Sequence, residues 1–159
     1  AISVGLGALI VMGERFPTSI SKRTVFAELI KTKWMLREKK EANLIGLPLM
    51  TDKIKVTAMH FLSSLVINCL LADLLLFALV VCRMIRLTIS HGVCEVSGFS
   101  FALFGFMLCD NSLRLAKEGY KYGQVGLSLT KRCGGKEWLA KVYLTLCFGI
   151  NYWSEKLLL

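Results

Sequence analysis

Side chains that could bind a metal or relay a proton are few and scattered. The sequence of 159 residues has two histidines, His60 and His91. His91 lies close to Cys94, but two ligands do not make a metal site. A phosphoacceptor histidine normally stands beside an acidic residue, and neither histidine has one as its immediate neighbour. We therefore expect no metal site and no histidine-centred chemistry.

Carboxylates do not form a catalytic pair in the sequence either. Asp73 and Asp110 each precede a predicted helix and are best explained as capping or turn residues. Glu137 and Glu155 fall in the terminal turns of the last predicted helix. The sequence contains no phosphate-binding loop, no protein-kinase motif set, no HExxH, no EF-hand loop and no GxSxG. It predicts a chain with no catalytic residue and no cofactor.

The cysteines follow the apolar pattern rather than a pairing pattern. Single cysteines inside apolar stretches behave as small buried hydrophobic residues and are typical of reduced, cytosolic proteins. A disulfide framework belongs to short secreted chains rich in loops. We therefore expect a cytoplasmic protein with free thiols at positions Cys69, Cys82, Cys94, Cys109, Cys133 and Cys147.

Composition favours long helices around a substantial core. Hydrophobic residues make up 55% of the chain, and Pro17 and Pro48 are its two prolines. The formal net charge is +9, with lysine and arginine densest over residues 31–40. A solvated helix face is the preferred interpretation of this run, and contact with anionic lipid or nucleic acid is the alternative. We expect no nucleic acid, because the run shows no aromatic interleaving, no recognition-helix pattern and no zinc spacing.

Periodicity and capping residues predict an all-α chain of about seven helices. Short polar breaks between successive helices imply antiparallel helical hairpins, stacked as a fragment of a tetratricopeptide-like solenoid. We treat residues 1–159 as one helical-repeat region, with leading helices over 1–46 and hairpins over 47–159. Both ends fall in apolar stretches, so we expect a piece of a longer chain. The predicted helices cover residues 2–12, 19–38, 53–66, 74–90, 95–109, 112–132 and 136–155, with a loop through 43–48. Ser19 or Ser21 is the predicted cap of the second helix, and Thr51 with Asp52 caps the third. The last helix has a predicted apolar stripe of Trp138, Val142, Leu146, Gly149 and Trp153.

Residues 61–82 allow two interpretations. They are almost entirely apolar, contain no lysine or arginine, and are long enough to cross a membrane. Asn68 and Asp73 lie within the stretch, however, and an ionised aspartate near the bilayer centre costs a few kcal/mol. Asp73 also suits the N-cap of a helix that starts at Leu74 and ends before Gly92. We therefore predict two helices with a turn near 68–73 and keep a membrane span as the alternative.

Two stripes of small residues are the most informative local pattern. Glycine inside a helix costs about 1 kcal/mol relative to alanine, so several glycines on one face need a packing reason. Spacings of three and four keep the residues of each stripe on one helix face. The sequence thus predicts two helices packed closely through Gly98, Ala102 and Gly105 on the first and Ala116, Gly119, Gly123 and Gly126 on the second. The candidate interaction surface on the second helix consists of Arg114, Lys117 and Lys121.

Four segments, in order, resemble one family of large bacterial and algal signalling proteins. Residues 47–52 (LPLMTD) resemble its LPPMTD entry to a helical hairpin, and residues 75–92 (LLFALVVCRMIRLTISHG) resemble its LxxLIVxKMVxLSLKYG helix. Residues 120–127 (YKYGQVGL) are similar to its GYxFGQLAL helix, and residues 31–37 (KTKWMLR) to a basic helix that contains tryptophan. The family usually has a proline where this chain has Leu74.

The resemblance implies a role as well as a fold. These proteins join a Ser/Thr-kinase-like domain, an AAA/STAND ATPase, a long tetratricopeptide-like region, a GAF sensor and a histidine kinase. The matching tract lies in the helical region, and none of the family's catalytic motifs has a counterpart here. The resemblance implies a non-catalytic scaffold or regulatory segment that contacts other domains of the parent chain or a protein partner. A small integral membrane protein with a span near residues 61–82 is the competing expectation.

Overall fold

The computed structural model of the chain describes residues 2–17, 19–109 and 115–151, and these residues form helices and their connections without a β-strand. The all-α prediction is therefore confirmed. The tetratricopeptide-like solenoid stays a prediction. The chain divides into two compact units, residues 1–40 with 48–92 and residues 41–47 with 93–159.

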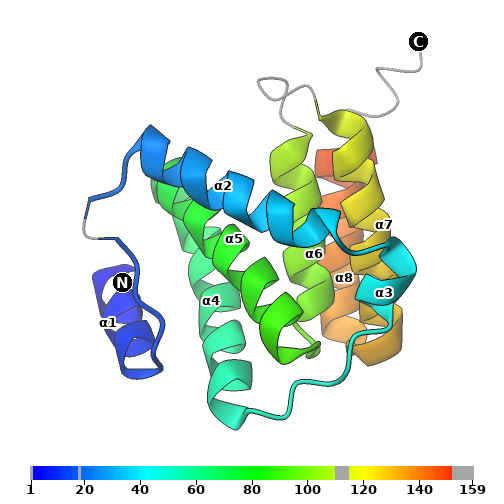
Figure 1. Ribbon diagram of the computed structural model, residues 1–159, viewed down its shortest axis with the longest axis horizontal. Coiled ribbons are helices and arrows are strands. Elements are labelled where there is room, and N and C mark those ends of the chain that lie inside the picture. The colour runs from blue at the N-terminus through cyan, green and yellow to red at the C-terminus, as the bar shows by residue number, and fades with distance from the viewer. Residues whose placement is uncertain (1, 18, 110–114, 152–159) are drawn as a thin grey trace. The chain divides into compact units, whose positions relative to one another are not determined.

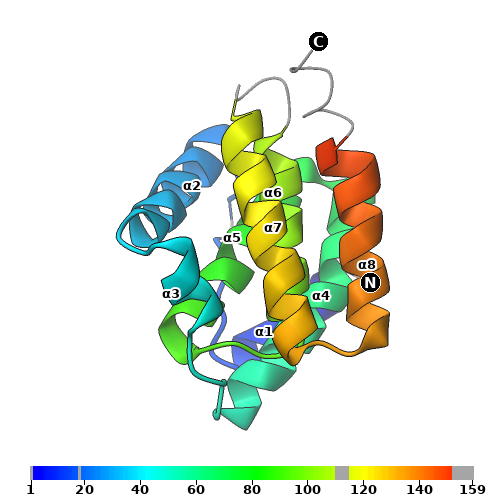
Figure 2. The same cartoon turned by 90° about the vertical axis from the view of Figure 1, so that its right-hand side faces the viewer.

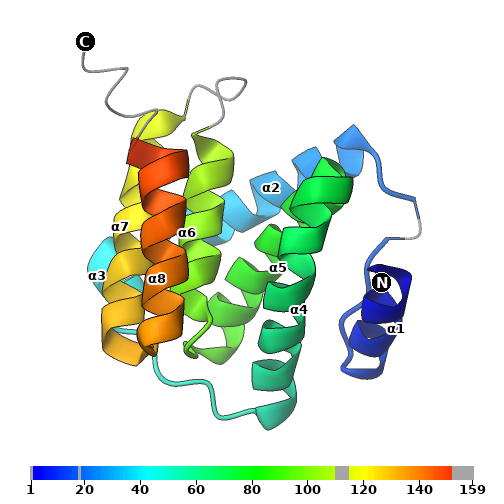
Figure 3. The ribbon, with the colours of Figure 1, turned by 180° about the vertical axis from the view of Figure 1, so that it is seen from behind.

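The first unit contains four helices: α1 (Ile2–Val11), α2 (Lys22–Arg37), α4 (Lys53–Ala72) and α5 (Leu74–His91). α4 and α5 form an antiparallel hairpin, with α1 packed on α4 (Figure 3). α2 packs across α5 through Leu29, Thr32 and Leu36, which are buried (Figure 1). Of the two predicted caps, Ser21 is the one that begins α2, because its hydroxyl accepts the Thr24 backbone N–H at 3.2 Å.

Asp73 alone separates α4 from α5. Its backbone is extended, with φ −154° and ψ 97°, and its Oδ1 accepts the N–H groups of Leu75 at 3.0 Å and Leu76 at 3.1 Å. The predicted N-cap is thus confirmed. The predicted turn over 68–73 is wrong in extent, because α4 runs through Asn68 to Ala72. Asn68 stays helical because its side-chain amide donates to the Ser64 carbonyl, 3.3 Å away.

Gly92 ends α5 where the sequence placed the stop. It has φ +100°, a conformation that favours glycine, and its N–H donates to the Thr88 carbonyl at 3.0 Å. A methyl group on Gly92 would lie 2.5 Å from the Pro48 carbonyl oxygen. The glycine is required both for the turn and for the chain that passes beside it.

The second unit contains α3 (Glu41–Ile45), α6 (Ser97–Leu108), α7 (Ala116–Cys133) and α8 (Lys136–Thr145), which continues as a π-helical segment, η1 (Leu146–Asn151). α6 runs antiparallel to α7, and α7 has α3 on one side and α8 on the other (Figure 2). The predicted apolar stripe of the last helix is buried at Trp138, Val142, Leu146 and Gly149, while Trp153 lies outside the described residues.

The prediction of a loop over 43–48 is wrong at its start, where α3 forms. This helix has only five residues, too few for a clear periodic signal. Leu44 is completely buried. The Arg132 guanidinium of α7 donates to the Ile45 carbonyl and, at 2.9 Å, to the Leu47 carbonyl. A side chain distant in sequence therefore satisfies the end of α3.

Candidate functional site

Glu14, in the segment after α1, forms two ion pairs within the first unit. Its side chain is only 5% exposed. Lys55 Nζ of α4 lies 2.7 Å from Oε1, and an Arg83 guanidinium nitrogen of α5 lies 2.7 Å from Oε2. Each carboxylate oxygen therefore has its own cation, and the cluster ties α4 and α5 to the segment between α1 and α2. We call these three residues the Glu14 cluster.

The pKa of Glu14 is lowered, because its two cations outweigh the effect of burial. Desolvation by burial, the largest single influence, raises the pKa of a carboxyl group. The hydrogen bonds and positive charges of Lys55 and Arg83 act in the opposite direction and together leave the pKa below its ordinary value. Glu14 is thus ionised at neutral pH. It cannot serve there as a general acid, because its proton is already lost.

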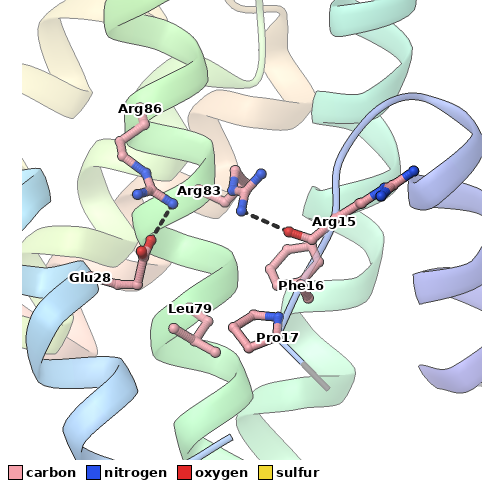
Figure 4. Close-up of a pocket in the computed structure, with 7 residues that line it drawn as sticks. All are labelled: Arg15, Phe16, Pro17, Glu28, Leu79, Arg83 and Arg86. Atoms are coloured by element: carbon pink, nitrogen blue, oxygen red, sulfur yellow. Dashed lines mark hydrogen bonds and ion pairs between the residues drawn. The ribbon is translucent and has the colours of Figure 1, made fainter. Parts of the chain in front are cut away.

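A small cleft lies beside this cluster. It has a volume of about 250 Å³ and is shown in Figure 4. Arg83 enters it from α5, donates to the Arg15 carbonyl at 2.8 Å and lies 5.2 Å from the centre of the Phe16 ring. The guanidinium of Arg15 points away from the other two arginines (Figure 4). The lining consists of Arg15, Phe16, Pro17, Glu28, Leu79, Arg83 and Arg86.

The cleft holds ion pairs rather than free reactive groups. Arg86 of α5 pairs with Glu28 of α2, and Arg83 pairs with Glu14. Within the part of the chain that the structure describes, Arg83 Nε is buried without a hydrogen-bond partner. The cleft is smaller than most ligand sites, which are about 300–1,000 Å³. Among the residues that the structure describes, its lining has no serine, cysteine, histidine or threonine to act as a nucleophile or base. The arrangement suits helix positioning.

The predicted small-residue stripes meet between α6 and α7. A methyl group on Gly126 would lie 2.6 Å from the Gly98 carbonyl oxygen, and the reverse distance is also 2.6 Å. A methyl group on Gly105 would lie 2.5 Å from the Gly119 carbonyl oxygen, with 2.6 Å in the reverse direction. The two backbones thus touch at two reciprocal glycine pairs.

The remaining predicted packing residues line the same contact or its rim. Ala102 lies against Gly126, since a methyl group added to Gly126 would be 2.8 Å from the Ala102 backbone nitrogen. Gly123 faces α8 and η1 instead, with Leu146 Cδ2 2.7 Å from the position of an added methyl group. Ala116 is buried at the start of α7, where its carbonyl lies 3.7 Å from the Cys109 sulfur.

The predicted basic surface on α7 is dispersed. Lys117 is exposed. Lys121 is half-buried, lies 3.7 Å from a Glu41 carboxylate oxygen of α3 and 5.8 Å from the centre of the Tyr122 ring. Arg114 lies outside the described residues. Lys121 thus contributes to the contact between α3 and α7. Of the predicted surface residues that the structure describes, Lys117 is the exposed one.

The histidines and cysteines form no reactive cluster in the described residues. His60 lies half-buried on α4, and His91 is exposed at the end of α5. No group of three His, Cys, Asp or Glu side chains within residues 2–17, 19–109 and 115–151 could hold a metal ion. Burial raises the pKa of the Cys69 and Cys82 thiols to about 11, so both remain protonated at neutral pH. Cys147 is exposed.

Sequence reasoning missed the Glu14 cluster. A lone glutamate between Gly13 and Pro17, next to an apolar helix, was the available signal. Lys55 and Arg83 are 41 and 69 residues away from it, so no local pattern joins them.

Two helices in the described chain are long and apolar enough to cross a membrane, α4 and α5. The apolar window of α5 is 61% buried and that of α4 is 39% buried. Core helices of soluble proteins satisfy the same criteria, so length and composition do not decide between the two environments. Comparisons of the chain with protein-family models, curated proteins and solved structures find no match.

Proposed function

We propose that the chain is a non-catalytic helical scaffold or regulatory segment that contacts other domains of a larger signalling protein or a separate protein partner. The observation that carries this proposal is that charged side chains hold the helices together, whereas large apolar side chains lie on the surface. Charged groups are engaged in holding helices together, as in the Glu14 cluster and the Glu28–Arg86 pair. Large apolar side chains meanwhile remain exposed on several helices.

The exposed apolar residues recur along the helices of both units. Single exposed hydrophobic residues are normal in soluble proteins, but repeated ones mark surfaces that contact another molecule. On α1 they are Val4, Ile10 and Val11; on α4 they are Ile54, Phe61, Ile67 and Leu71; on α8 and η1 they are Tyr143, Leu144 and Phe148. The resemblance to the helical region of multidomain kinases supports the same role.

Site-specific photo-crosslinking tests the proposal. A photoreactive residue replaces Phe61 on α4 or Phe148 on η1, and the matched control replaces the exposed Lys136. Both apolar positions are expected to give discrete protein adducts, in trans or with other domains of the parent chain, and the control is expected to give few. Adducts with lipid alone, or equal adducts at all three positions, would contradict the proposal.

A second candidate is a membrane hairpin made of α4 and α5. Their length and apolarity favour it. This candidate replaces the single span expected over residues 61–82, because Asp73 divides those residues between α4 and α5. Alkaline carbonate extraction of cell membranes separates the candidates: a scaffold segment is released into the supernatant, whereas a hairpin stays in the pellet.

A further inference from the structure

The outward face of α2 carries an apolar ridge. Phe26, Ile30 and Trp34 follow one another at intervals of four residues, which places them one above another on the helix surface. Their side chains are 61%, 51% and 65% exposed. The opposite face of α2 packs on α5 (Figure 1), so the ridge is presented by a helix already fixed in the fold.

Basic residues share this face with the ridge. At 100° per residue, Arg23 and Arg37 fall within the arc that Phe26, Ile30 and Trp34 span. Arg23 and Arg37 are exposed, as are Lys22 and Lys31 at the edges of the arc. The expected absence of aromatic interleaving is wrong, because Trp34 stands within residues 31–40. The helix places Phe26 and Trp34 beside Arg23 and Arg37.

Two carboxylates belong to α2 and its C-cap: Glu28 within the helix, and the exposed Glu38, which follows Trp34 at the same four-residue spacing. Glu28 lies on the side that faces α5, where it pairs with Arg86. The outward side of α2 therefore combines the exposed Lys22, Arg23, Lys31 and Arg37 with three apolar residues, and the exposed Glu38 lies at its C-terminal end.

We infer that this face docks on a membrane surface rich in anionic lipid headgroups. Tryptophan prefers the headgroup level of a bilayer, and phenylalanine is common on the lipid-facing side of interfacial helices. Lysine and arginine are attracted to the negative leaflet. Protein interfaces, in contrast, are depleted of lysine at their cores. The attachment is peripheral, because α2 stays packed on α5 while its outer side chains enter the headgroup layer. It goes beyond the proposed scaffold role by giving the segment a location.

Vesicle co-sedimentation of the full chain tests this inference. The probes are vesicles of phosphatidylcholine alone and vesicles with about one third phosphatidylserine. We expect binding only to the anionic vesicles, and release as NaCl approaches about 1 M, where charge attraction is screened within about 3 Å. A blue shift of Trp34 emission, absent from Trp34→Phe, should accompany binding.

Two double variants separate the charge from the apolar ridge. Arg23→Glu with Arg37→Glu, and Phe26→Ser with Trp34→Ser, should each weaken partitioning about tenfold or more. The matched controls change exposed residues outside α2: Lys131→Glu with Lys136→Glu, and Leu49→Ser with Tyr120→Ser. The controls should stay within about twofold of the unchanged chain. Circular dichroism verifies that all four variants remain helical.

Several results would overturn the inference. Equal binding to neutral and anionic vesicles would do so, as would equal losses in the α2 variants and their controls. A pellet that resists both high salt and alkaline carbonate would indicate an inserted hairpin instead of peripheral docking. Absence of vesicle binding, together with salt-sensitive binding of an acidic protein that needs Arg23 and Arg37, would assign the face to a protein partner.

Discussion

The two units of this chain hold their helices together by different means. In the first unit, long side chains meet: Glu14 joins α4 and α5 through Lys55 and Arg83, and Glu28 joins α2 to α5 through Arg86. In the second unit, α6 and α7 approach until their backbones touch at Gly98–Gly126 and Gly105–Gly119, where neither residue has a side chain. The first arrangement should be sensitive to charge, and the second to volume.

The largest expected effect comes from removing the charge of Glu14. Glu14→Gln leaves Lys55 and Arg83 without their counter-ion in a mostly buried site, which should lower the free energy of unfolding by about 3 kcal/mol. Urea denaturation at neutral pH measures the loss. Hydrogen exchange should quicken most in α4 and α5. The matched control is Glu137→Gln, which breaks the exposed pair with Lys141 and should cost less than about 0.5 kcal/mol.

Acid should reproduce part of this loss in the unchanged chain. The pKa of Glu14 is lower in the folded chain than in the unfolded one, where it is about 4.3. The unfolded state therefore binds the proton more readily, so the stabilisation is complete above pH 4.3 and disappears as pH falls through the folded pKa. Glu14→Gln lacks this contribution. If both chains lost equal stability between pH 6 and pH 3, the proposed origin would be wrong.

The next largest effect is expected from a single methyl group in the second unit. Gly126→Ala or Gly105→Ala would force the crossing of α6 and α7 apart, because the new methyl lies within 2.6 Å of a carbonyl oxygen. We expect a loss of about 2 kcal/mol. Thermal or urea unfolding checks it, with hydrogen exchange quickened in α6 and α7. An unchanged midpoint would show that the crossing has room to relax.

Asp73→Leu should produce a smaller loss. The substitution removes the acceptor for the Leu75 and Leu76 N–H groups at the start of α5, which should cost about 1 kcal/mol in water. Asp73→Asn is the control, since asparagine caps helices as well as aspartate does. Increased stability or stronger membrane retention of the leucine variant would favour the membrane hairpin.

Gly7→Ala should have the smallest effect and the opposite sign. Gly7 lies within α1, is exposed, and an added methyl group would have no neighbour within 4 Å. Alanine should stabilise the chain by about 0.4–1 kcal/mol, mainly by restricting the unfolded state. Comparison of urea midpoints for Gly7→Ala and Gly126→Ala thus isolates close packing from glycine's intrinsic flexibility.

Local signals in the sequence predicted much of the helical layout. Ser21, Asp52 and Asp73 supply caps to N–H groups two or three residues ahead of them, so the sequence marks these starts directly. Gly92 marks a stop for an equally local reason. Asn68 was misleading, because a polar side chain in an apolar run can bond to its own helix and need not mark a turn.

The sequence by itself determined the helical class, the caps and the small-residue stripes, since each depends on neighbours within about one helical turn. Only the tertiary structure decided that Glu14 meets Lys55 and Arg83, that Arg132 completes the short α3, and that Phe26, Ile30 and Trp34 remain exposed. These outcomes depend on which helix faces pack together. That choice is made by contacts between segments tens of residues apart, which no local pattern encodes.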